Sequence, residues 1–288
     1  TGWYTLSLHD ALPISVVIGG GYIGLEMVEN LVRRGIETTV LERLDQIMPQ
    51  VDPEMVVPIH AELHKQGVDL QLGRAVTSIE KSNGELVVTT PRAGRFAANL
   101  VIVATGVKPD VDLAQRAGLK IGVTGGIVVD EHMRTSDPSI WAVGDAVEVT
   151  DFVTGQPALI ALAGPAARQA RVAADVICGR DSRYRGTQGS AVVGVFGLTL
   201  AMTGASEKTL RRYGIPFEKS YTQSADHATY YPGSHPMVLK LLFSPGDGRV
   251  LGAQAVGRTG VEKRIDVLAM AIQKGATVFD LEEAELCY

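Results

Sequence analysis

Hydrophobic and polar positions alternate in a regular order at the start of the chain. Val16–Ile18 is a short, fully apolar run of the kind that forms a buried strand. Residues 22–34 have the spacing of an amphipathic helix, and Gly35 stops it. Residues 38–41 then form a second apolar run, which ends at Glu42. The pattern predicts a strand, a helix and a second strand in direct succession.

The same alternation continues as far as residue 106. Asn83-Gly84 between two alternating runs is the strongest short signal for a hairpin. The pattern therefore predicts one Rossmann-type α/β unit over residues 16–106, with a β-meander in place of its last crossover. Its further elements are a helix over 52–66 and strands over 68–72, 76–81, 85–90 and 100–104.

Beyond Pro109 the pattern changes, and from about Gly189 it becomes rich in strands. An alanine-rich helix is expected from Pro165 to Cys178, before Gly179. The other expected elements are strands over 127–129 and 140–143, a hairpin of 237–243 with 249–257, and helices over 261–274 and 281–286.

The glycines after the first strand have the spacing of a dinucleotide-binding turn. Gly19 permits the tight turn, Gly21 lets a pyrophosphate approach bare backbone, and Gly24 lets the helix pack closely. The phosphates would bind the N–H groups at the helix N-terminus. Glu42 would accept hydrogen bonds from the ribose hydroxyls and repel a 2′-phosphate, which favours NADH. Arg43 follows directly and softens that choice, so NADPH stays open.

Composition narrows the class of protein. The chain has 288 residues, 45% of them hydrophobic, 20% charged, with a net charge of −5. It has no basic run of the kind that binds nucleic acid and no apolar stretch of about 20 residues that would span a membrane. Its two cysteines lie far apart, without metal-type or disulfide-type spacing, so we expect no metal site and a cytoplasmic location.

The two ends do not resemble natural termini. Residues 1–15 contain no initiator Met and no signal-peptide pattern, because His9 and Asp10 interrupt the short apolar run. We expect a non-native leader here, joined to a protein that lacks its N-terminal part. The predicted helix over 281–286 simply runs out at Tyr288.

Taken together, the motifs resemble the pyridine nucleotide-disulfide oxidoreductase family, in the branch of coenzyme A-disulfide reductases and NADH oxidases. The resemblance implies an FAD domain interrupted by an NAD-binding domain (16–106), the second part of the FAD domain (107–187), and a dimerisation domain (188–288) that makes a homodimer. The matching motifs are Gly19-Gly20-Gly21-Tyr22-Ile23-Gly24, Ala104-Thr105-Gly106, Trp141-Ala142-Val143-Gly144-Asp145, Leu162-Ala163-Gly164-Pro165, His227-Ala228-Thr229-Tyr230-Tyr231 and Gly252-Ala253-Gln254-Ala255.

The resemblance also implies cofactor contacts. Tyr22 would cover the flavin until nicotinamide displaces it, with Glu26 near the path of the hydride; a plain polar helix face is the alternative for both. Gly106 would let the backbone pass close to the NAD ribose; a plain turn glycine is the alternative. The remaining cofactor positions implied are Ile23 beside the glycine turn, Gly144 and Asp145 at the flavin ribityl and phosphate groups, and Leu162 and Ala163 at the flavin pyrimidine edge.

For the chemistry, the resemblance implies two tyrosines, Tyr230 and Tyr288, that reach the partner subunit's redox cysteine; interface aromatics are the alternative. Tyr231 could replace Tyr230. His227 would contact coenzyme A or lie solvated in a loop. The redox cysteine itself has no counterpart here, and Cys178 is interpreted as a small core residue.

The expected activity is hydride transfer from NADH to FAD, then to a cysteine and a disulfide such as coenzyme A disulfide. An NADH oxidase or peroxidase, acting on oxygen or peroxide, is the first alternative. The second is an inactive fragment that binds nucleotide and dimerises.

Overall fold

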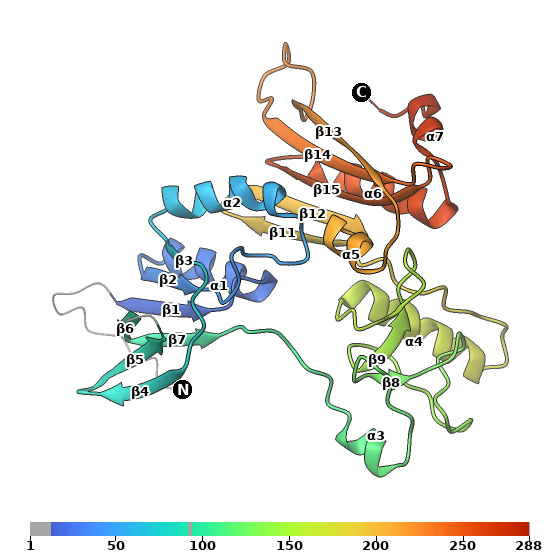
Figure 1. Cartoon of the computed structure of the whole chain (residues 1–288), viewed down its shortest axis with the longest axis horizontal. Helices are drawn as coiled ribbons and strands as arrows, with labels where there is room; N and C mark the ends of the chain where they lie inside the picture. The colour runs from blue at the N-terminus through green and yellow to red at the C-terminus, as the bar shows by residue number, and fades with distance from the viewer. Residues whose placement is uncertain (1–12, 92–93, 288) are drawn as a thin grey trace. The chain divides into compact units, whose positions relative to one another are not determined.

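The computed structural model describes residues 13–91 and 94–287. The chain divides into two compact units (Figure 1). Of the described residues, the first contains those up to Gly106 together with Val193–Leu200, and the second contains Val107–Val192 and those from Ala201 onward.

A parallel sheet with the strand order β3-β2-β1-β7 forms the centre of the first unit. Strand β1 takes a middle position because Val16 and Val17 are fully buried. Strands and helices alternate along the chain as a Rossmann-like unit requires. The elements are β1 (Ile14–Ile18), α1 (Tyr22–Arg33), β2 (Glu37–Leu41), α2 (Pro53–Lys65), β3 (Asp69–Gln71) and β7 (Leu100–Val103).

The strand β1 begins at Ile14, two residues before the predicted start, so Ile14 and Ser15 of the expected leader pair with β2. The Ser15 hydroxyl also lies 3.0 Å from the Thr38 hydroxyl. Residues 1–12 of that expected leader lie outside the described residues.

An antiparallel meander completes the first unit, with β4 (Ser78–Ser82), β5 (Glu85–Thr90) and β6 (Gly94–Ala98) in that order. Asn83 and Gly84 both have positive φ, at 51° and 88°, as the predicted hairpin turn requires. The meander packs on the parallel sheet through a shared core of Val16, Ile18, Leu41, Val88 and Ala98.

The second unit begins with a small sheet in the order β10-β9-β8. Its elements are α3 (Asp112–Arg116), β8 (Ile127–Val128), β9 (Val147–Thr150), β10 (Pro157–Ala158) and α4 (Ala163–Ile177). The predicted strand over 140–143 is wrong. Trp141 makes only an isolated bridge with Arg134 and packs against a core that contains Val172 of α4, so these apolar residues fill a core rather than form a ladder.

A five-stranded sheet in the order β11-β12-β15-β14-β13 follows. Helix α6 packs on β15, and both contribute to one core with Ala253, Ala255, Ile265 and Leu268. The elements are β11 (Ala191–Val195), β12 (Leu198–Gly204), α5 (Glu207–Arg212), β13 (Glu218–Ala225), β14 (Pro236–Phe243), β15 (Val250–Gly257), α6 (Val261–Lys274) and α7 (Val278–Glu283).

The last helix starts earlier than its hydrophobic pattern indicates. Thr277 caps α7 by accepting the Asp280 N–H, and the Asp280 carboxylate accepts the Thr277 N–H in return. This reciprocal cap begins the helix at Val278, and Ala284 is already extended. The prediction of a helix over 281–286 is therefore wrong in its boundaries.

Candidate functional site

The glycine turn lies at the carboxyl edge of the parallel sheet, directly after β1. Gly19 has a φ of +107°, a conformation that side chains rarely adopt. A Cβ added to it would come within 2.3 Å of the Ala104 carbonyl oxygen, just beyond β7. The Gly19 N–H also donates to the Leu41 carbonyl at 2.9 Å. The turn is thus held between the ends of the two strands that flank β1.

Two further glycines have opposite surroundings. A Cβ on Gly24 would lie 2.0 Å from the Gly19 carbonyl oxygen, so the first turn of α1 packs directly on the glycine turn. A Cβ on Gly21, the N-cap residue, would meet nothing within 4 Å. Open space therefore adjoins the start of α1, where the first backbone N–H groups have no partner within the helix.

The electrostatics of that helix end favour an anion. Helix α1 has twelve residues, no acidic residue in its first turn and no side-chain hydrogen bond to its cap. The helix dipole places partial positive charge at this end. The terminus therefore has the chemistry of a phosphate site, and its surroundings fit the pyrophosphate of a dinucleotide.

Glu42 lies at the end of β2, beside the turn, and is only 9% exposed. Its Oε2 accepts the Gly20 N–H at 2.8 Å, and its Oε1 accepts the Leu44 N–H at 2.8 Å. A carboxylate can accept about four hydrogen bonds, so capacity remains for ribose hydroxyls. Glu42 also ties β2 to the glycine turn, a structural role that the sequence did not indicate.

Tyr22 and Glu26 differ in exposure, although both follow the turn on α1. Tyr22 is half-buried, and burial raises the pKa of its phenol. Glu26 is exposed. Ile23 is apolar but 56% exposed, so it does not belong to the buried side of the helix. The buried side of α1 consists of Gly24, Leu25, Val28 and Leu31.

Glu29 and Arg33, four positions apart on α1, form an ion pair, with Arg33 Nη2 at 2.5 Å from Glu29 Oε1. Glu29 Oε2 also accepts the Phe196 N–H at 3.1 Å, a contact across 167 positions that the sequence did not indicate. Gly106 follows β7 with a φ of +103° and is exposed. A Cβ on Gly106 would meet nothing within 4 Å, so open space adjoins its backbone.

The second unit contains the positions expected at a flavin. Gly144 has a φ of +88°, and its N–H donates to Gln169 Oε1 at 2.7 Å. Asp145 next to it is exposed. Leu162 is the extended N-cap of α4, and Ala163 is the first residue of that helix. Since Gln169 belongs to α4, it links the Gly144 turn to the helix that begins at Ala163.

The sequence patterns did not indicate a role for Gln169, which the structure shows to be only 2% exposed. Its position in the sequence could have predicted this role, because a polar residue on the buried side of an alanine-rich helix needs a hydrogen-bonding partner. The buried side of α4 consists of Pro165, Gln169, Val172 and Ala173.

The expected tyrosines lie on the loop between β13 and β14. Tyr230 is 84% exposed and Tyr231 is 67% exposed. Both line an open hollow of about 370 Å³, together with His227, Ala228 and Pro232. Tyr288 lies outside the described residues.

The comparisons with known proteins agree with this arrangement. The profile of the pyridine nucleotide-disulphide oxidoreductases matches residues 6–170, and the profile of their dimerisation domain matches residues 190–286. The chain belongs to the pyridine nucleotide-disulphide oxidoreductase family. The fold agrees, with a Rossmann-like parallel sheet followed by the antiparallel sheet of the dimerisation domain.

Similar proteins come from both expected branches of this oxidoreductase family. NADH oxidase of Methanocaldococcus jannaschii is 36% identical over 94% of this chain and 60% of its own length. Coenzyme A disulfide reductase of Staphylococcus aureus is 33% identical over 95% of this chain and 61% of its own length. The structure of reduced CoADR-RHD from Bacillus anthracis superposes with a TM-score of 0.93 at 46% identity, over 96% of this chain and 49% of that one. The chain thus spans about three fifths of the curated relatives it matches.

One expectation about the cysteines is wrong. Cys178 is the C-cap of α4 and is exposed, so it is not a core residue. Its helix turns Val172 and Ala173 inward, while Ile177 at its C-terminal end is 60% exposed. Within residues 13–91 and 94–287, no helix is long and apolar enough to cross a bilayer.

Proposed function

We propose that this chain supplies the pyridine nucleotide site, part of the flavin site and the dimer-forming part of an FAD-dependent NAD(P)H:disulfide oxidoreductase of the coenzyme A-disulfide reductase type. The observation that carries the proposal is the start of α1. Gly24 packs it on the glycine turn, while Gly21 leaves open space in front of it. The similarity to coenzyme A disulfide reductase of Staphylococcus aureus supports the substrate class.

Residues 16–106 form the NAD-binding domain in this proposal. The backbone N–H groups from Gly21 to Gly24 bind the pyrophosphate, and Gly19 shapes the turn beneath them. Glu42 accepts hydrogen bonds from the ribose and disfavours the 2′-phosphate of NADPH. Tyr22 and Glu26 project from the first turns of α1 toward the nicotinamide end, with Ile23 exposed beside them, and Gly106 lets the ribose approach the backbone.

Residues 107–187 supply the second part of the flavin site. The Gly144 turn, held by Gln169, presents Asp145 to the ribityl and phosphate groups. Leu162 and Ala163 start a helix of fifteen residues with no acidic residue in its first turn, so its N-terminus stabilises negative charge near the pyrimidine edge. A bound flavin would take hydride from NADH and pass two electrons to a thiol–disulfide pair.

Residues 188–288 form the dimerisation domain, through which two copies make a homodimer. Tyr230, or Tyr231 beside it, hydrogen-bonds the thiolate that leaves when the disulfide is reduced, and Tyr288 has the same role. The exposure of Tyr230 and Tyr231 supports this assignment, because such phenols are accessible to a substrate.

A second candidate is an NADH oxidase or peroxidase, which the Methanocaldococcus jannaschii relative favours. Both candidates share the nucleotide and flavin sites and differ in the final electron acceptor. The two candidates predict different results for a protein that also contains the redox cysteine. Only the disulfide reductase would consume NADH with coenzyme A disulfide under argon, since an oxidase turns over only when oxygen or peroxide is present.

The purified chain tests the proposal in two measurements. We expect calorimetry to detect one NADH site per chain, because the whole glycine turn and Glu42 are present. We expect no NADH oxidation with coenzyme A disulfide, because neither Cys178 nor Cys287 matches the redox cysteine. Absence of heat with NADH and NADPH alike would refute the nucleotide site. A flavin absorbance band with turnover would refute the view that the chain supplies only binding parts.

The choice of nucleotide is tested at Glu42. We expect Glu42→Gln to narrow the preference for NADH over NADPH by about tenfold, because the charge that repels the 2′-phosphate is removed. Arg43→Ala should weaken NADPH and leave NADH unchanged. Calorimetric titration of both nucleotides measures the ratio, and Glu37→Gln, at the exposed start of β2, is the control. Tighter binding of NADPH by the unaltered chain contradicts the assignment of Glu42.

A further inference from the structure

The exposed tyrosine loop is defined as residues 227–235 between β13 and β14. A buried carboxylate, that of Asp226, lies at the base of this loop, and we call this base the neck. The Asp226 side chain is only 3% exposed, although the loop beyond it reaches solvent. Burying a carboxylate is costly unless hydrogen bonds or opposite charge compensate it. The groups around the Asp226 carboxylate therefore show how its charge is stabilised.

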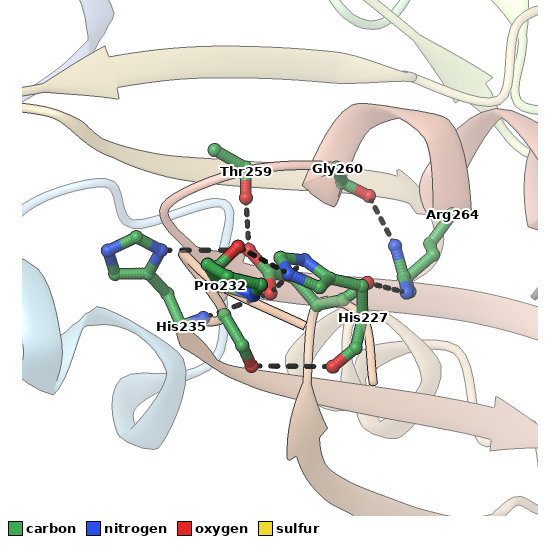
Figure 2. A network of polar contacts seen from close by, with 8 residues as sticks. His227, Pro232, His235, Thr259, Gly260 and Arg264 are labelled. Carbon is green, nitrogen blue, oxygen red and sulfur yellow. Dashed lines mark hydrogen bonds and ion pairs between the residues drawn. The ribbon is translucent and has the colours of Figure 1, made fainter. Parts of the chain in front are cut away.

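The loop itself and the segment after β15 supply the partners of this carboxylate (Figure 2). Oδ1 accepts the His235 N–H at 2.9 Å, and Oδ2 accepts the Thr259 hydroxyl. The His227 Nδ1 lies 3.0 Å from Oδ1, and the His235 Nδ1 lies 3.9 Å from Oδ2. Two imidazoles and one hydroxyl thus surround the charge.

The backbone of the neck is held separately. The Asp226 N–H donates to the His235 carbonyl at 2.9 Å. From α6, Arg264 Nη2 donates to the Asp226 carbonyl at 2.6 Å, and Nη1 donates to the Gly260 carbonyl at 3.0 Å. Arg264 is the charged group that α6 directs at the neck, and its recorded bonds go to carbonyls rather than to the carboxylate. The ionisable partners that the structure records for the carboxylate are therefore the two imidazoles.

His227 connects the neck to the tip of the loop. Its Nδ1 faces the Asp226 carboxylate, while its Nε2 lies 3.4 Å from the Pro232 carbonyl oxygen. Both oxygens are acceptors, and a neutral imidazole has a single N–H. Only the doubly protonated ring can donate to both. The ring also meets Tyr231 edge to face, with the centroids 6.0 Å apart.

We infer that Asp226 and His227 are positioning residues, a carboxylate–imidazolium clamp that sets the conformation of the tyrosine loop and tightens it when His227 is protonated. This inference deepens the proposed function, since the loop carries Tyr230 and Tyr231. The clamp itself is a property of the loop and exists whether or not either phenol takes part in the reaction.

The direction of the pH dependence follows from the two groups. Hydrogen bonds from Thr259 and from the His235 backbone lower the pKa of Asp226 to about 2. The carboxylate is therefore charged throughout the range in which imidazoles titrate, about pH 5 to 8. The protonated His227 ring has two N–H donors and completes both hydrogen bonds, whereas the neutral ring has one N–H and can make only one of them. The loop is tight at low pH within this range and loosens as pH rises.

Hydrogen exchange of the full chain, followed by mass spectrometry of the peptide over the loop, tests the clamp. After correction for the intrinsic pH dependence of exchange, we expect protection of the loop to fall about tenfold from pH 5.5 to pH 8. Asp226→Asn keeps an acceptor for the His235 N–H but removes the charge, so protection should no longer depend on pH. His227→Gln should flatten the profile in the same way, because the His235 ring, whose Nδ1 lies 3.9 Å from the carboxylate, is beyond hydrogen-bond distance.

Asp247→Asn is the matched control, because this aspartate caps the turn at the opposite end of β14 and accepts the Arg249 N–H. It should leave the loop profile unchanged. A pH-independent loop in the unaltered chain, or a normal profile in both the Asp226→Asn and His227→Gln variants, overturns the inference. His227→Gln keeps the test valid if the Asp226 variant does not fold.

The proposed role of the two tyrosines is tested separately from the clamp. Tyr230→Phe and Tyr231→Phe should leave the exchange profile intact, because neither hydroxyl is part of the clamp. If these variants also leave binding of coenzyme A disulfide unchanged in calorimetry, the role of the tyrosines fails while the clamp stands. If the exchange profile fails, the clamp is refuted whatever the tyrosines do.

Discussion

Gly21→Ala should weaken NADH binding by at least about tenfold while leaving the stability of the chain unchanged. Gly21 has a φ of −82°, which alanine adopts without strain, and its added Cβ would meet no protein atom within 4 Å. The methyl group would instead occupy the space in which the pyrophosphate approaches the start of α1. The variant thus separates contact with the nucleotide from folding.

Calorimetric titration with NADH measures the affinity, and urea unfolding measures the stability. Gly24→Ala is the informative contrast, because its Cβ would lie 2.0 Å from a backbone oxygen and must displace the turn, which lowers both quantities. Gly246→Ala, in a distant turn with nothing nearer than 4.0 Å, is the control. Unchanged NADH affinity in Gly21→Ala would show that the nucleotide does not use this helix end.

Glu207→Gln should lower the free energy of unfolding of the second unit by about 2 to 3 kcal/mol. Its Oε1 accepts Lys240 Nζ at 2.6 Å and Lys219 Nζ at 2.7 Å, and its Oε2 accepts Arg211 at 2.9 Å. Lys240 is 0% exposed, so the substitution weakens a 2.6 Å charge-assisted hydrogen bond to a buried ammonium group. Lys240→Met removes the buried charge itself and should be close to neutral.

The effect of Glu207 depends on pH in a defined direction. Burial raises the pKa of Glu207, but hydrogen bonds from Lys219, Lys240 and Arg211 outweigh it and lower the pKa from 4.5 to about 2. A lowered carboxyl pKa stabilises the folded state above the ordinary pKa, and the stabilisation is lost as pH falls through the folded value. The gap between the unaltered chain and Glu207→Gln should therefore be full above pH 4.5 and shrink toward pH 2.

Urea midpoints from circular dichroism at several pH values measure this gap. Glu218→Gln is the control, since Glu218 is an exposed carboxylate beside Lys219 on β13. A stability loss below about 0.5 kcal/mol in Glu207→Gln, similar to an ordinary surface change, would show that the charge cluster contributes little.

Local chemistry made several elements predictable from the sequence. Asn83-Gly84 specifies its hairpin turn because both residues tolerate positive φ. The helix over 261–274 ends at Gly275, which has a left-handed φ of 70°. The glycine turn was readable for the same reason, since Gly19 takes a conformation that few other residues adopt.

Errors arose where a local pattern had more than one tertiary use. The apolar residues around Trp141 could form a strand or fill a core, and packing against Val172 decided for the core. Cys178 follows an apolar helical pattern, but the rotation of α4 leaves it exposed. Periodicity gives the spacing of a helix face, while the neighbouring elements decide where that face ends.

The sequence by itself determined the family, most strands and helices of the first unit, and the glycine turn, because each depends on local residue patterns. Only the tertiary structure placed Gln169 on the Gly144 turn, 25 positions away, and Thr259 on Asp226, 33 positions away. Such polar pairs have no periodic signature, and they form only after the packing of apolar faces has brought distant segments together.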